Sequence, residues 1–150
     1  MFSFFKKSVL VYAPTSGEVK RLEDVDDEVF SAKMAGDGVA ILPESGLFCS
    51  PVDGKITRVF PTKHAFSIES RGVEILVHIG LDTVELKGEG FELLKSEGES
   101  VRVGDEIVRV DLELLKSRGK DIITPIVVAD RSIKDIKLGS VERGDLIFKV

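Results

Sequence analysis

The sequence predicts an all-β protein: an antiparallel β-sandwich or partly closed barrel, with internal repeats and one or two short surface helices. Apolar and polar residues alternate with a period close to two along most of the chain, in runs rich in Val, Ile and Phe. Gly, Asp, Pro and Ser separate these runs, as expected for strands joined by turns. With 150 residues, of which 43% are hydrophobic, the chain is long enough for one compact core.

Two pairs of similar segments indicate a sheet folded onto itself. VRVGDEIVRV at 101–110 aligns with VERGDLIFKV at 141–150, and both carry a Gly-Asp turn. APTSGEV at 13–19 aligns with SPVDGKI at 50–56, and both contain a Pro-x-x-Gly bend. No low-complexity linker divides the chain. We therefore expect a single domain over residues 13–150, preceded by an N-terminal extension over residues 1–12.

Two stretches break the strand pattern and are predicted to form short covers on the surface. They are FELLKSEG at 91–98 and DLELLKSRG at 111–119. In the second stretch Asp111 can cap the N-terminus of a helix, and Gly119 can end that helix after about two turns.

Composition narrows the class of protein. The 21 basic and 26 acidic residues give a net charge of −5 with no basic block, so a nucleic-acid partner is not expected. The one cysteine, Cys49, excludes an internal disulfide and is interpreted as a buried structural thiol. No apolar run is long enough to span a bilayer, and we expect a cytoplasmic protein. The N-terminal MFSFFKK could touch an anionic membrane surface, but only peripherally.

Both histidines of the chain, His64 and His78, flank one predicted hairpin. A three-residue loop at 70–72, with Gly72 in the left-handed conformation, would make the two histidines cross-strand partners. They would then share a face with the apolar side chains of the same strands, Phe66, Ile68 and Leu76. A two-residue turn at Arg71-Gly72 would shift the register and send His78 to the opposite face.

Several chemical roles are open to such a pair of imidazoles. Each could be a satisfied histidine beside the core. His64 and His78 could bind zinc, but only weakly, because two nitrogens leave the coordination shell incomplete. Acid-base catalysis would also suit them, although the sequence shows no Ser/His/Asp order and no phosphate-binding glycine loop. Finally, a neutral imidazole nitrogen could accept a phosphoryl group while the second imidazole contacts the phosphate oxygens.

The segments around the histidines resemble a known family. TKHAFSIES and GVEILVHIGLDTVELKGEGF, together with APTSGEV, EDVDDEVFSAKMAGDGVAI and SPVDGKI, are similar to the glucose-type enzyme IIA of the bacterial sugar phosphotransferase system. The resemblance covers nearly the whole chain from Ala13 on, and it implies an antiparallel β-sandwich. It also implies a phosphotransferase component that requires no cofactor.

The resemblance implies roles for individual residues. His78 would take a phosphoryl group from the phosphocarrier protein HPr and pass it to a cysteine of a sugar-specific enzyme IIB, part of the IIB/IIC permease. His64 would support the transfer, and Thr62 would hydrogen-bond into the site. The residues that it implies for the partner-binding surface, including two acidic rim residues, are Phe30, Met34, Ala35, Phe60, Leu76, Val84, Asp27 and Asp82.

Two further interpretations accompany this one. The chain could be a regulatory module whose phosphorylation state controls protein targets through the same face. Lys33-Met34 is also similar to the modified lysine of biotin- or lipoyl-carrying domains. Lys33, however, adjoins Gly36-Asp37 directly and would not stand at the tip of its own hairpin.

Overall fold

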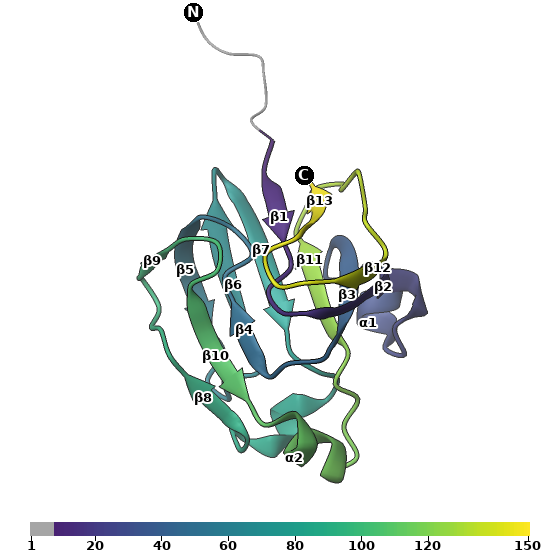
Figure 1. The fold of residues 1–150 in the computed structure, drawn as a ribbon, viewed down its shortest axis with the longest axis vertical. Helices are drawn as coiled ribbons and strands as arrows, with labels where there is room; N and C mark the ends of the chain where they lie inside the picture. Colours follow the sequence, from purple (N-terminus) through teal and green to yellow (C-terminus); the bar gives the residue numbers. More distant parts are fainter. Residues whose placement is uncertain (1–7) are drawn as a thin grey trace, which may run out of the picture.

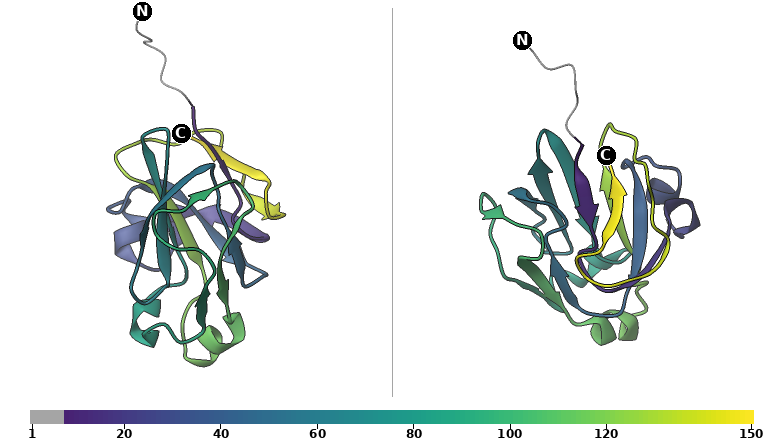
Figure 2. Two further views of the ribbon diagram at one scale, coloured as in Figure 1. Left: turned by 90° about the vertical axis from the view of Figure 1, so that its left-hand side faces the viewer. Right: turned by 45° about the horizontal axis from the view of Figure 1, so that its top comes forward.

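The computed structural model describes residues 8–150, and these form a sandwich of antiparallel strands (Figures 1 and 2). An eight-stranded sheet has the order β12 (Gly139–Val141), β2 (Gly17–Arg21), β3 (Asp37–Pro43), β11 (Thr124–Val128), β7 (Val73–His78), β6 (Ala65–Ser70), β5 (Gly54–Val59) and β9 (Ser100–Val101). Smaller sheets contain β4 (Leu47–Cys49), β10 (Glu106–Val110) and β8 (Phe91–Leu93), and β1 (Leu10–Tyr12) with β13 (Leu146–Lys149). The all-β prediction is confirmed, and the strands form an open sandwich rather than a closed barrel.

Helical structure is limited to four short segments among the described residues. The predicted helix at 111–119 is α2 (Leu112–Ser117), and the Asp111 side chain caps it by accepting a hydrogen bond from the Leu114 N–H. The prediction for 91–98 was wrong, because residues 91–93 form β8 and pair with β10. Cross-strand pairing there outweighs the local sequence pattern. The remaining segments are α1 (Glu28–Ser31) and two 3-10 turns, η1 (Leu22–Asp24) and η2 (Thr83–Leu86).

Buried apolar side chains form two clusters on opposite faces of the eight-stranded sheet. The larger cluster fills the space between the sheets and includes Phe48, Phe66 and Phe148, none of which is exposed. The smaller cluster lies under η1 and α1, and it contains Leu22, Val25, Phe30, Ala40, Leu81, Ile123 and Val127. Ala35 and Leu76 pack against its edge. Since Leu76 lies two residues before His78 on β7, this smaller cluster is the apolar base of the histidine site described below.

The repeated segments interlock in equivalent ways. The N–H of Ala13 donates to the Asp145 carbonyl at 2.8 Å, and the N–H of Ser50 donates to the Asp105 carbonyl at the same distance. In return, the glycine N–H of each Gly-Asp turn donates to the carbonyl of Ala13 or Ser50. The sequence repeats therefore correspond to two structural units, each made of one Pro-x-x-Gly bend and one Gly-Asp turn.

The β6–β7 hairpin has a different register from the one predicted. Its turn contains only Arg71 and Gly72, both with positive φ (52° and 80°), as in the turns that favour two-residue hairpins. Ala65 therefore pairs with His78, and Phe66 pairs with Val77. Phe66 and Ile68 face the main core, whereas Leu76 and His78 lie on the other face of the sheet. The shared face predicted for His64, Phe66 and His78 was wrong, because a shift of one residue reverses every side chain.

The histidine end of β7 lies far from the paired β1 and β13 strands. Figures 1 and 2 show β1 and β13 side by side at one end of the molecule and α2 at the other. The turn after His78 is tied to the α2 end, because the Leu81 N–H donates to the carbonyl of Asp121 and Lys120 pairs with Glu85.

The domain boundary at residue 13 stays a prediction. β1 lies within the predicted extension over residues 1–12 and pairs with β13. The prediction of membrane contact falls on residues 1–7, which lie outside the described part of the chain. Among residues 8–150 no helix is long and apolar enough to cross a membrane.

Cys49 is fully buried and free, as predicted. The guanidinium of Arg143 donates to its sulfur at 3.6 Å. Burial raises the pKa of the Cys49 thiol, although Arg143 opposes that effect. A thiol in this environment is inert.

Candidate functional site

His78 ends strand β7, and its ring is held by the backbone directly after it. Nδ1 of His78 lies 2.8 Å from the carbonyl oxygen of Gly80. Because a carbonyl can only accept, Nδ1 carries the proton and Nε2 has the free lone pair. The ring is half-buried and lies 5.0 Å from the ring of Phe30, which the α1 helix supplies.

His64 reaches the same place from a turn rather than from a strand. It follows Lys63, whose φ of 64° lies in the left-handed region, and β6 begins only at Ala65. The His64 carbonyl accepts the N–H of Ile79 at 2.7 Å, which fixes the turn beside the end of β7. The Thr62 hydroxyl lies 2.7 Å from His64 Nδ1. Thr62 thus lies within the site, in contact with His64 rather than His78.

The two imidazoles meet edge to face. Their ring centroids lie 5.0 Å apart at an interplanar angle of 82°. His64 is 4% exposed, and its burial, together with the neighbouring His78, lowers its pKa from 6.5 to about 4. Burial also lowers the pKa of His78, while the Gly80 carbonyl, Asp27 and Asp82 oppose that shift. Both rings are therefore neutral at pH 7, the state in which an imidazole nitrogen is nucleophilic.

Further aromatic contacts extend the pair on both sides. The Phe60 ring lies 5.5 Å from the His64 ring, and the Arg58 guanidinium lies 4.1 Å over Phe60. Sequence reasoning missed Arg58, although an Arg two residues before Phe on a strand places both side chains on one face. Together with Phe30 beside His78, these contacts hold both imidazoles by packing as well as by hydrogen bonds.

The turn after His78 has a strict backbone requirement. Gly80 has a φ of 77°, and a Cβ there would lie 2.6 Å from the Thr83 methyl and 2.9 Å from the Asp121 carbonyl oxygen. Only glycine fits this position. Thr83 is fully buried and was also missed by sequence reasoning, although its fixed spacing after the histidine in HIGLDT was a usable signal.

The predicted partner-binding residues differ in their exposure. Met34 is 71% exposed and Val84 is 52% exposed, whereas Phe30 is buried beneath His78. Leu76, Ala35 and Phe60 are half-buried. The sequence did not identify Val29, which is 46% exposed on α1. Exposed apolar side chains at the edge of a polar site are typical of a protein-binding face.

The acidic rim residues are placed by helix capping and by a turn. The Asp27 carboxylate accepts a hydrogen bond from the Val29 N–H at 2.9 Å and so caps α1. Asp82 is exposed, with a φ of 57°, at the start of η2. Both carboxylates act electrostatically on His78. The acidic stretch around Asp27 therefore contains a helix that supports the site, and not only a solvated loop.

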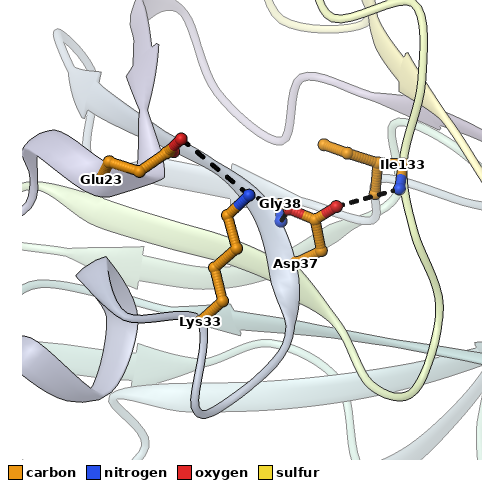
Figure 3. A network of polar contacts seen from close by, with 5 residues as sticks. All are labelled: Glu23, Lys33, Asp37, Gly38 and Ile133. Carbon is orange, nitrogen blue, oxygen red and sulfur yellow. Dashed lines mark hydrogen bonds and ion pairs between the residues drawn. The ribbon is translucent and has the colours of Figure 1, made fainter.

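Lys33 forms ion pairs with two carboxylates, Glu23 and Asp37, as Figure 3 shows. Its ammonium lies 3.3 Å from Asp37 and 3.9 Å from Glu23. Asp37 also accepts the backbone N–H groups of Gly38 and Ile133 at 2.9 and 3.1 Å. This network joins the end of α1 to the start of β3, and a lysine held in this way is unlike the free lysine of a swinging-arm domain.

The described residues offer few ligands for a metal ion. Residues 8–150 contain no group of three or more His, Cys, Asp or Glu side chains placed to hold a metal ion. His64 and His78 supply two imidazoles, which is fewer than the three protein ligands of a catalytic zinc site.

Comparison with known proteins identifies the family. The model of the family described as phosphoenolpyruvate-dependent sugar phosphotransferase system, EIIA 1, matches residues 9–133. A solved structure of glucose permease IIA from Mycoplasma capricolum superposes with a TM-score of 0.91 at 43% identity, and it covers 99% of each chain. The glucose-specific EIIA component of Haemophilus influenzae is 53% identical over 123 residues, which are 81% of this chain and 74% of that protein.

Another relative is much longer than this chain. The glucoside-specific EIICBA component of Staphylococcus carnosus is 46% identical over 145 residues, but the chain spans only 21% of its length. The fold and the site define a β-sandwich protein with a pair of neutral histidines next to each other at the surface. The chain belongs to the EIIA 1 family of the phosphoenolpyruvate-dependent sugar phosphotransferase system.

Proposed function

We propose that this chain is a phosphocarrier that accepts a phosphoryl group on His78 from HPr and passes it to a sugar-specific enzyme IIB during sugar uptake. The observation that carries the proposal is the 2.8 Å contact between His78 Nδ1 and the Gly80 carbonyl oxygen. It fixes one neutral tautomer and leaves the lone pair on Nε2, the nitrogen that must attack phosphorus. Family membership and the likeness to glucose-specific EIIA components support it.

The chemical step is a displacement between two nitrogens. Nε2 of His78 forms a bond to phosphorus while the bond from phosphorus to the donor histidine of HPr breaks, and the electron pair of that bond returns to the donor ring. The His78 ring gains positive charge, and the Gly80 carbonyl stabilises it because Nδ1 keeps its proton. The cysteine thiolate of enzyme IIB then displaces His78 from phosphorus, and the ring returns to neutral. Both steps depend on positioning.

His64 and Thr62 would stabilise the transferring group. If the Thr62 hydroxyl donates to His64 Nδ1, the proton of the neutral His64 ring lies on Nε2. That N–H can donate to a phosphoryl oxygen on the adjacent His78. The two histidines would thus hold opposite tautomers, one as nucleophile and the other as hydrogen-bond donor.

The apolar surface around the pair would bind both partners in turn. Met34 and Val84 are its most exposed predicted members, and a dry contact there would exclude water from the reacting phosphoryl group. Asp27 and Asp82 would orient a basic partner at the rim, since opposite charges across an interface favour encounter. HPr and the IIB/IIC permease are the proposed partners.

The test is phosphorylation of the purified chain by phosphoenolpyruvate, enzyme I and HPr, followed by intact-mass measurement. We expect a gain of one phosphoryl group in the wild-type chain and none in His78→Gln, because glutamine has no ring nitrogen to form the phosphoramidate. A wild-type chain that gains no mass with an active donor system would refute the proposal. Full labelling of His78→Gln would move the nucleophile to another residue.

A regulatory role through the same face is the second candidate. Phosphorylation would add about −2 charge to a surface on which Val29, Met34 and Val84 are exposed, and so it would change which targets bind. Adding enzyme IIB separates the two functions: a carrier loses its phosphoryl group rapidly, whereas a pure switch retains it. A chain that does both would release the group to enzyme IIB and also bind other targets in only one state.

Three further predictions belong to this proposal. The transfer as written needs no cofactor, because nucleophile and leaving group are side chains. Weak zinc binding by His64 and His78 would need another ligand from solvent or a partner, and it would compete with phosphorylation. We also propose that the relay operates in the cytoplasm.

A further inference from the structure

The hydrogen bond between His78 and Gly80 depends on the path of a short turn. Nδ1 belongs to residue 78 and its acceptor to residue 80, so the orientation of the peptide units around Gly80 decides whether the bond forms. The Gly80 carbonyl and the Leu81 N–H belong to one planar peptide unit and point in opposite directions. The Leu81 N–H donates to the carbonyl of Asp121 at 2.9 Å. That bond turns the Gly80 carbonyl toward His78.

The preceding peptide unit is held by Thr83. Its hydroxyl donates to the Ile79 carbonyl at 2.6 Å, and the bond is buried. The methyl group of Thr83 lies only 2.6 Å from the position that a Cβ of Gly80 would occupy. Thr83 therefore holds the Ile79 carbonyl with its hydroxyl and fills the space beside Gly80 with its methyl group. Since Thr83 is 0% exposed, water does not compete for the hydroxyl.

We infer that Thr83 is a positioning residue that holds His78 in the tautomer with the proton on Nδ1. It acts through the Ile79 and Gly80 peptide units, which present the Gly80 carbonyl to the ring. Without the hydroxyl, the Ile79 carbonyl loses the donor that holds it, and the peptide units can rotate. The proton of His78 would then distribute between Nδ1 and Nε2, and the Nε2–H form has no lone pair on Nε2 with which to attack phosphorus. The kinetic part of this inference rests on the proposed function.

The test compares Thr83→Ser with Thr83→Ala, because these two variants differ by the hydroxyl alone. Thr83→Val keeps the volume of the side chain and removes the hydroxyl. A matched control is Thr15→Val, because Thr15 is also 0% exposed and also donates its hydroxyl to a backbone carbonyl, that of Ser45, at 3.1 Å. The first readout is the nitrogen NMR shifts of the His78 ring in the unphosphorylated chain, which report the tautomer directly.

We expect wild type, Thr83→Ser and Thr15→Val to show the Nδ1–H form, and Thr83→Ala and Thr83→Val to show a mixture. The rate of phosphoryl uptake at saturating HPr should fall roughly threefold to tenfold in Thr83→Ala and Thr83→Val, as expected for loss of one buried hydrogen bond. The KM for HPr should stay unchanged, because the partner-binding surface is intact.

An undisturbed His78 tautomer in both Thr83→Ala and Thr83→Val would overturn the inference, and so would an equal disturbance in Thr15→Val. A rise in the KM for HPr with no change in tautomer would assign Thr83 to partner binding instead and would also overturn it. Failure of the proposed function can be distinguished from failure of the inference about Thr83. If the wild-type chain accepts no phosphoryl group from HPr, the NMR comparison still decides the role of Thr83.

Discussion

The two histidines differ in the kind of group that holds Nδ1. The Gly80 carbonyl can only accept from His78, whereas the Thr62 hydroxyl can donate to His64. His64→Gln should therefore still accept a phosphoryl group from HPr but pass it to enzyme IIB more slowly, since the lost imidazole no longer stabilises the departing group. Labelling followed by a chase with enzyme IIB measures both steps. A chase as fast as that of wild type would remove His64 from the transfer.

Burial of His64 also predicts how stability depends on pH. Its pKa is lowered from 6.5 to about 4, so the unfolded chain binds more protons than the folded one between these values, and stability falls as pH falls. The free energy of unfolding should decrease by about 2 kcal/mol between pH 7 and pH 5 from this group, with His78 acting in the same direction. Denaturant unfolding of wild type and His64→Gln checks this. Identical pH slopes for the two proteins above pH 5 would contradict it.

Sequence reasoning could predict at the residue scale that the histidines meet, because both flank a single hairpin. It could not predict how they meet. The loop at 70–72 allows two registers that differ by one residue, and only the backbone conformation of Arg71 chooses between them. The two histidines lie side by side although the predicted register was wrong. The reason is that His64 lies outside β6, in a turn at Lys63, where the alternation of a strand no longer fixes the side-chain direction.

At the scale of single elements, α1 and η2 carry the surface that surrounds the histidines. Helix α1 could not be predicted, because four residues are too few to show helical periodicity, and only the capping Asp27 marks its start. Its position is set by contacts outside the helix, with Phe30 against His78 and Lys33 paired with Asp37 at the start of β3. By contrast, α2 is six residues long and has Asp111 and Gly119 at its ends, so it could be predicted.

Val84 on η2 provides a direct test of that surface. Because Val84 is 52% exposed, Val84→Asp should change the stability by no more than about 0.5 kcal/mol. Transfer from HPr and to enzyme IIB should both slow by roughly tenfold to thirtyfold, because a charge would be buried in each complex. Transfer kinetics and thermal unfolding of the same samples measure the two effects.

Leu10→Asp is the matched control, since Leu10 is 39% exposed on β1, away from the histidines. Equal slowing in Leu10→Asp would mean that added charge, rather than the surface, is responsible. Phe60→Asp should behave differently from Val84→Asp. Phe60 is half-buried against His64, so its replacement should lower the melting temperature as well as the transfer rates.

At the scale of the whole molecule, the β1–β13 pair and the histidines lie at different ends of the sandwich. β1 and β13 are paired at one end, and the turn after His78 is tied to the residues after α2 at the other (Figure 1). The repeats made the sandwich predictable, because each bend and each Gly-Asp turn is a local signal. The order of strands in the sheet was not predictable, since it depends on pairings such as β3 with β11.

This arrangement predicts that a folded domain fused after Val150 through a flexible linker leaves phosphoryl transfer unchanged. The fused domain would lie beside β13, and partners would still reach His78. Uptake from HPr, measured by labelling of the fused and free chains, tests the prediction. A slow fusion with normal stability would show that partners also use the β1–β13 end. In the glucoside-specific EIICBA component of Staphylococcus carnosus, the matching region is likewise part of a much longer polypeptide.

Pairing of β1 with β13 has a consequence for synthesis of the chain. Leu10 pairs with Lys149, and Ala13 bonds to Asp145, so β1 has no partner strand until β13 has been synthesised. Until then Val9 and Val11, both buried in the finished core, lack their final neighbours. Folding dominated by such distant contacts is slow, on the order of milliseconds to seconds. Closure of β1 onto β13 is therefore expected to be a late step of folding, and Val9 and Val11 stay exposed until it occurs.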